Sequence, residues 1–69
     1  MSRTYNRILT LLGNGKMPSS ILIKKFEEEF GYAPKRQTIY CDLSRARKEG
    51  IIKKDENGFY YIDRDKMKE

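Results

Sequence analysis

Side chains that can bind phosphate groups and the edges of bases are concentrated between Lys35 and Lys54. This segment contains seven basic and two acidic residues, a net charge of +5, whereas the rest of the 69-residue chain has eight of each and no net charge. Arginine and lysine bind phosphate oxygens, and arginine and glutamine also form paired hydrogen bonds to purine edges. The segment therefore predicts a surface for a polyanion, nucleic acid first and an anionic membrane second. A plain solvated charged face is the alternative, and this asymmetry argues against it.

The residue types that the chain lacks narrow the chemistry further. There is no histidine, and Cys41 is the single cysteine, so histidine-based triads, cysteine–histidine zinc sites and an internal disulfide are excluded. A chain of this length forms one domain with a small core and no deep pocket. We therefore expect no enzyme activity, cofactor, metal ion or small-molecule effector. The free thiol, the short apolar runs and the polar start MSRTYNR favour the cytoplasm, at the nucleoid, and no membrane partner.

Two amphipathic helices are expected to come first. Tyr5, Ile8 and Leu12 follow the helical period, which predicts a helix over residues 3–12 that ends at the following glycines. A second helix is predicted over residues 20–30, with Ser19 or Ser20 as its N-cap and Gly31 as its C-terminal stop.

A third helix is predicted over residues 35–49, and its side chains are segregated by type. Helical steps of about 100° place a core stripe on one side. That stripe contains Ile39, Leu43, Ala46 and Gly50. The opposite, outer face contains Gln37, Cys41, Ser44 and Lys48. One flank is basic and aromatic, with Arg36, Tyr40 and Arg47. The other flank holds the acids Asp42 and Glu49 beside Thr38 and Arg45.

A β-hairpin is predicted over residues 51–62. Asn57-Gly58 is a strong turn signal because both residues tolerate a positive φ, and the alternation of Tyr60 and Ile62 predicts that both face the core. Residues 63–69 are polar, and we expect a frayed tail. The predicted fold class is therefore α+β, with three helices followed by a hairpin that packs on them.

The order of these elements, together with one sequence pattern, resembles the winged helix-turn-helix family, closest to its deoxyribonucleoside-regulator (DeoR-like) type. The pattern is T-I-x-x-D-L, six further residues, and then G-I-I. It is formed by Thr38, Ile39, Asp42, Leu43, Gly50, Ile51 and Ile52. The resemblance covers residues 5–62. The chain departs from the family in its turn YAPKRQ between Gly31 and Thr38, which is longer than usual. We expect a bare DNA-binding module, without the effector domain of full regulators.

The resemblance implies a sequence-specific protein for double-stranded DNA, acting as a small stand-alone transcription regulator whose third helix enters the major groove. Gln37 suits adenine and Arg36 suits guanine, whereas Arg47 and Lys48 would hold the backbone. Tyr40 can bind phosphate or pack on a thymine methyl group. The predicted contacts on the helix are Lys35, Arg36, Gln37, Thr38, Tyr40, Cys41, Ser44, Arg45, Arg47 and Lys48. Those on the wing, directed at the backbone or minor groove, are Lys53, Lys54 and Asn57.

Several alternatives stay open on the sequence alone. Arg45 can pair with Asp42 and Glu49 instead of binding DNA. Groove readers commonly dimerise, and a homodimer could use Tyr5, Leu9 and Leu12 of the first helix unless these residues form the core. An excisionase-like protein that bends DNA would need the same surface. A protein–protein interaction module would instead need an exposed apolar patch, and a binder of single strands or RNA would need exposed aromatic residues.

Overall fold

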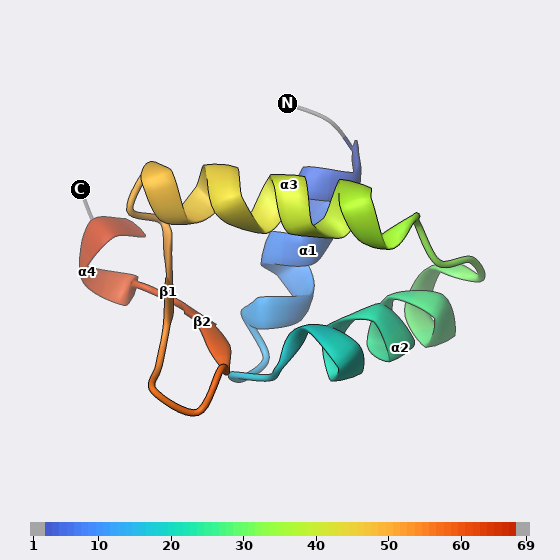
Figure 1. The fold of residues 1–69 in the computed structure, drawn as a ribbon, viewed down its shortest axis with the longest axis horizontal. Helices are drawn as coiled ribbons and strands as arrows, with labels where there is room; N and C mark the ends of the chain where they lie inside the picture. Colours follow the sequence, from blue (N-terminus) through green and yellow to red (C-terminus); the bar gives the residue numbers. More distant parts are fainter. Residues whose placement is uncertain (1–2, 68–69) are drawn as a thin grey trace.

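Three helices followed by a two-stranded antiparallel hairpin make up most of the fold, as predicted for the α+β class (Figure 1). The computed structural model describes the backbone of residues 3–67 and the side chains of residues 3–65. The order along the chain is α1 (Arg3–Leu12), α2 (Ser19–Phe30), α3 (Arg36–Lys48), β1 (Ile52–Lys54), β2 (Tyr60–Ile62) and α4 (Arg64–Met67). The first three helices begin and end within one residue of their predicted bounds.

The C-terminal end of α2 follows the prediction from the sequence, whereas its N-terminal end does not. Gly31 closes the helix in the left-handed region at a φ of 82°, and its N–H donates to the Glu27 carbonyl. The start differs from the prediction, because Pro18 is the N-cap residue and no side chain caps the helix. Ser19 is the first helical residue instead of the cap. Its hydroxyl is thus released for a tertiary contact with α3.

The hairpin is paired on both sides of β2. On one side β1 pairs antiparallel with β2, in a register that places Ile52 opposite Ile62 and Lys54 opposite Tyr60. On the other side Met17, in the α1–α2 loop, exchanges two backbone hydrogen bonds with Tyr60 at 3.0 and 2.8 Å. The segment before α2 therefore continues the sheet beyond its two named strands, which fixes the hairpin to the helical part.

The turn of the hairpin differs from the predicted one. Gly58 has a φ of 84°, but no described residue other than glycine has a positive φ, so Asn57 does not adopt the left-handed conformation. The Gly58 N–H donates to the Asp55 carbonyl, and the Asp55 N–H donates to the Phe59 carbonyl. This is a three-residue loop with a glycine bulge rather than a two-residue turn.

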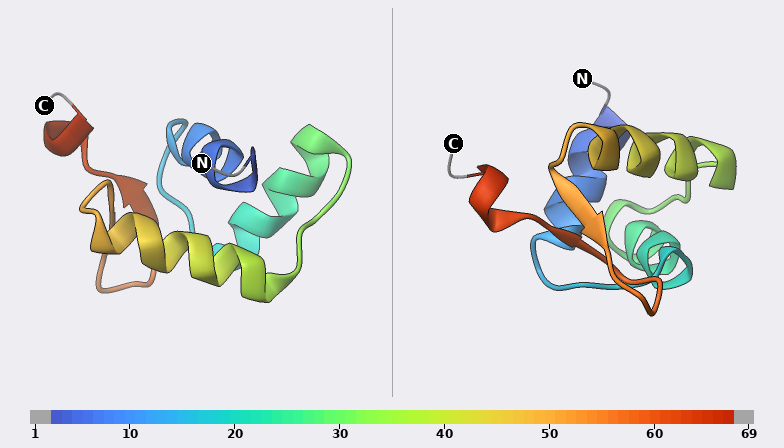
Figure 2. Two further views of the ribbon diagram at one scale, coloured as in Figure 1. Left: turned by 90° about the horizontal axis from the view of Figure 1, so that it is seen from above. Right: turned by 60° about the vertical axis from the view of Figure 1, so that its left-hand side comes forward.

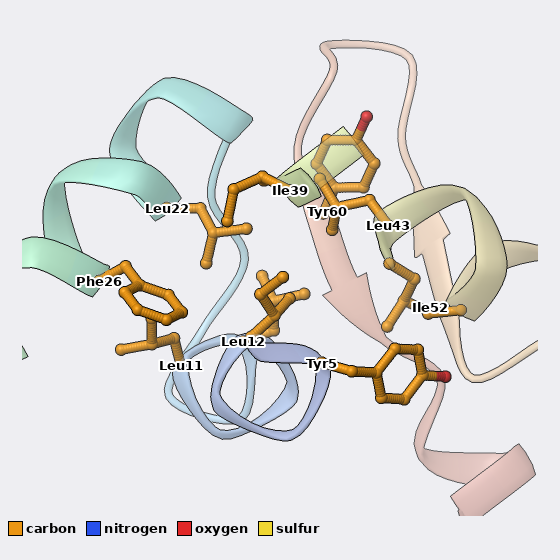
Figure 3. Packing of buried hydrophobic residues seen from close by; sticks show 11 residues of the cluster. Tyr5, Leu11, Leu12, Leu22, Phe26, Ile39, Leu43, Ile52 and Tyr60 are labelled. Carbon is orange, nitrogen blue, oxygen red and sulfur yellow. The ribbon is translucent and has the colours of Figure 1, made fainter. Parts of the chain in front are cut away.

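The core lies where α1, α2, α3 and the hairpin meet (Figure 3). Leu12 of α1 is in the middle of the cluster, with Phe26 of α2 on one side and Leu43 of α3 on the other. Ile52 and Tyr60 close the cluster from the hairpin. Of the two residues predicted to face the core, Tyr60 is buried and Ile62 is half-buried and packs against the cluster. Full burial of side chains of this size contributes about 1.5–3 kcal/mol each.

Tyr5 and Leu12 both lie in this core at 2% exposure. They are therefore unavailable for the dimer contact considered from the sequence, which leaves the half-buried Leu9 alone of the three.

The predicted frayed tail is wrong for residues 64–67, which form the short helix α4. Arg64 donates from its guanidinium to the Gly13 carbonyl at 3.0 Å, and this bond ties α4 to the end of α1. The Asp63 carboxylate accepts from the Asp65 N–H and supports the first turn. Residues 68–69 of the expected tail lie outside the described residues. Among the described residues, no helix combines the length and the apolar character that crossing a membrane requires.

Candidate nucleic-acid interface

The outer face of α3 is defined by what the helix buries. Ile39, Leu43 and Ala46 are each at most 1% exposed and pack into the core, so the opposite side of the helix faces solvent. An open surface hollow runs along that side. It is lined by Gln37, Tyr40, Cys41, Ser44, Arg45, Arg47 and Lys48, all of them predicted contact residues. The remaining three predicted residues of the helix, Lys35, Arg36 and Thr38, are exposed at its N-terminal end.

Tyr40 lines one side of the hollow, and its hydroxyl contacts a residue of α2. Its ring is 45% exposed, and its hydroxyl lies 3.4 Å from the Ser19 hydroxyl at the start of α2. This contact anchors the far end of the ring. Sequence reasoning did not identify Ser19 as part of the site, because a serine beside a proline is equally typical of a helix cap.

The C-terminus of α3 sets the direction in which the hairpin leaves the helix. Gly50 has a φ of 79° and donates to the Arg47 carbonyl, while the Ile51 N–H reaches back to the Ala46 carbonyl at 2.9 Å. This pair of bonds is a Schellman motif, which ends the helix and turns the chain sharply. From above, α3 and the hairpin loop project to the same edge of the view, opposite α1 (Figure 2, left), but in the perpendicular direction α3 lies along the top of the molecule and the hairpin loop at the bottom (Figure 1).

The two wing lysines do not share a face of the hairpin. Successive side chains on a strand point to opposite faces. Lys54 places its ammonium group 5.4 Å from the centre of the Tyr60 ring, whereas Lys53 lies 3.8 Å from the Asp63 carboxylate. Both lysines are exposed, as is Asn57 in the loop. The structure thus separates two residues that the sequence analysis grouped together.

Asp55 organises the loop of the hairpin. One carboxylate oxygen accepts from the N–H groups of Asn57 and Phe59 at 2.9 Å, and the other pairs with Lys16 at 3.2 Å. The Phe59 N–H is the main cause that lowers the pKa of this carboxyl below its ordinary value, and Lys16 and the Asn57 N–H lower it further. Lys16 and the two N–H groups therefore offset part of the negative charge of the Asp55 carboxylate.

Asp42 is buried, which the helical wheel did not predict. The wheel placed it on the same flank of α3 as Glu49, and in the structure it is 6% exposed and its Oδ2 has no hydrogen-bond partner among the described residues. Arg45 pairs with neither Asp42 nor Glu49 in the described part of the chain, and its guanidinium carbon lies 5.6 Å from the centre of the Tyr5 ring. Of the two acids in the basic segment, Glu49 alone is exposed.

Burial is also the main influence on Tyr5, which lies beneath this flank. It raises the pKa of the Tyr5 hydroxyl, as does the negative charge of Glu49, while Arg45 lowers it.

The long turn between α2 and α3 is fixed by a cluster that the sequence did not reveal. Arg7 of α1 lies 4.4 Å from the centre of the Phe30 ring and donates to the Tyr32 hydroxyl at 2.9 Å. The Tyr32 ring packs edge-on against Phe26, with 5.5 Å between ring centres. The turn that departs from the winged-helix pattern is thereby attached to α1 and α2 just before α3 begins.

All thirteen predicted contact residues are exposed, and seven of them line one hollow. Comparisons with protein families, curated proteins and solved structures find no match.

Proposed function

We propose that this protein binds double-stranded DNA in a sequence-specific manner and acts as a small transcription regulator. In this proposal the fold is a winged helix-turn-helix, α3 enters the major groove, and the hairpin is a wing on the backbone or in the minor groove. The observation that carries it is the hollow on the outer face of α3, whose lining combines Gln37 and Tyr40 with three exposed cations. A helix fits the major groove, where all four base pairs can be distinguished.

The distribution of charged residues also supports the outer face of α3 as the DNA-binding surface. The seven basic residues of the segment 35–54 are all exposed, whereas the Asp42 side chain is on the buried side of α3. The first turn of α3 carries no acid and no side-chain cap, so its free N–H groups and Lys35 favour a phosphate at that end. The acidic run Glu27 to Glu29 is exposed on α2, a different helix.

The surface gives less support to a protein–protein interaction module. That function predicts one exposed apolar patch. The exposed large apolar side chains among the described residues come from four separate segments, as Ile21, Tyr32, Tyr40 and Tyr61. An excisionase-like role would use the same face of α3 and differs in bending its DNA, which a circular-permutation gel assay measures.

Fluorescence anisotropy with a labelled random-sequence duplex, repeated over a series of salt concentrations, tests the proposal. About five phosphate contacts from α3 and one wing lysine predict a slope of log K against log salt of about −4 to −5. The variant Arg47→Gln/Lys48→Gln removes two of these cations, the two assigned to the backbone, and is expected to make the slope shallower by about 2.

Lys24→Gln/Lys25→Gln is the matched control, because it removes two exposed cations from α2 and lowers the net charge equally. It should leave the slope close to that of the unmodified protein. Equal effects of the two double variants would show that net charge, rather than α3, governs binding. Failure to bind any duplex at low salt would refute the proposal.

A further inference from the structure

The hollow on α3 has small side chains along its middle and long ones around them. Gln37, Cys41, Ser44 and Lys48 follow one another along the outer stripe of the helix, and the two central members are the short ones. Both are exposed, and no other element of the described protein lines the hollow. A surface of this shape accommodates a small protruding group at its centre and charged groups at its rim.

The centre of the hollow is suited to an apolar group. Cysteine behaves as a small hydrophobic residue with a weak donor, and serine adds a β-carbon and one hydroxyl. The Tyr40 ring, held at its hydroxyl end by Ser19, adds an aromatic wall. Neither Cys41 nor Ser44 can form the paired hydrogen bonds by which arginine or glutamine reads a purine. Shape and apolar contact therefore contribute most of the recognition at this point, beside at most a single hydrogen bond from the Ser44 hydroxyl.

The major-groove edges of the four ordinary bases carry one apolar protrusion, the C5-methyl group of thymine. We propose that the hollow between Tyr40, Cys41 and Ser44 accepts the C5-methyl group of a pyrimidine, with Arg47 and Lys48 on the adjoining phosphates. The inference rests on the proposed function and adds to it the base feature that this part of α3 reads. Thymine and 5-methylcytosine carry the same methyl group at the same place, so either can supply it.

The test begins with selection of tightly bound duplexes from a random pool by the full chain. Each thymine of an enriched site is then replaced singly by uracil, which lacks the methyl group, and the Kd is measured by anisotropy. Loss of one buried methyl group, about 0.8 kcal/mol, is expected to weaken binding about three- to fourfold at one or two positions. Placing 5-methylcytosine, paired with guanine, at those positions and comparing it with cytosine shows whether either source of the methyl group is accepted.

Two protein variants connect the effect to the hollow. Cys41→Ser replaces the thiol by a hydroxyl at an exposed position, so the fold should be retained, and the uracil penalty should shrink towards onefold. Ser20→Ala, at an exposed site on α2, should keep the full penalty.

Three results would overturn the inference. They are enriched sites without thymine, uracil duplexes that bind as tightly as their thymine parents, and a penalty that Cys41→Ser leaves unchanged. In each of these cases duplex binding itself persists and the proposed function stands. Absence of saturable duplex binding would instead overturn both.

Discussion

The cation–aromatic cluster that holds the α2–α3 turn makes a quantitative prediction about stability. Arg7 is half-buried, with its guanidinium carbon 4.4 Å from the Phe30 ring centre and 5.8 Å from that of Tyr32. A cation over an aromatic face at a partly exposed site contributes about 0.5–1 kcal/mol. The exposed hydrogen bond from Arg7 to the Tyr32 hydroxyl adds about 0.5 kcal/mol. Arg7→Met, which keeps an apolar stem and removes the charge, should therefore lower the free energy of unfolding by about 1–1.5 kcal/mol.

A double-mutant cycle isolates the contact between the guanidinium and the ring. Arg7→Met, Phe30→Leu and the double variant would be unfolded in urea and followed by far-UV circular dichroism. We expect a coupling energy of about 0.5–1 kcal/mol, and a fall in Tm of about 4–12 °C for Arg7→Met alone. Arg3→Met, at an exposed position of the same helix, is the control and should change stability by less than about 0.5 kcal/mol. A coupling energy indistinguishable from zero would refute this account of the turn.

Two further predictions concern the hairpin loop. Because the pKa of Asp55 is lowered in the folded protein, its contribution to stability is complete above the ordinary pKa of an aspartate and is lost as the pH falls through the lowered value. Urea unfolding across the acid range should show this loss, and Asp55→Ala should remove that part of the pH dependence; identical profiles would contradict the assignment. Gly58→Ala should lower the free energy of unfolding by about 1–2 kcal/mol in thermal denaturation, because alanine is strained at a φ of 84°. The added methyl group meets open space, so this loss reports the backbone conformation alone. Gly58→Asn should lose less, because asparagine tolerates the left-handed region better than alanine does. An alanine variant that melts like the parent would contradict the role of backbone conformation.

Local patterns were sufficient to predict the helices and much of the exposed face of α3. The helical period of Tyr5, Ile8 and Leu12 is a property of the chain itself, and Gly31 and Gly50 end their helices because they adopt positive φ without strain. Once the buried stripe of α3 was identified, its outer residues followed by geometry.

Features that depend on packing between distant segments were not predictable in the same way. A helical wheel assigns Asp42 an angle but cannot show how far α1 and the hairpin extend around α3, and that extent decides its burial. Asn57-Gly58 is compatible with more than one turn. The Asp55 carboxylate accepts from the N–H groups of Asn57 and Phe59, which favours the three-residue loop. The Arg7 contact with Tyr32 joins residues 25 positions apart and has no local signal at all.

The loop between α1 and α2 has a consequence for how the chain folds during synthesis. It contacts the C-terminal part of the protein through Lys16 and Asp55, 39 positions apart, and through Gly13 and Arg64, 51 positions apart. Met17 of the same loop adds two backbone hydrogen bonds to Tyr60. A nascent chain that has left the ribosome only as far as α3 can form its helices but still lacks the strands that supply Ile52 and Tyr60 to the core. Completion of the core therefore follows emergence of the hairpin, and we expect resistance to proteases to appear only after Ile62 has left the ribosome.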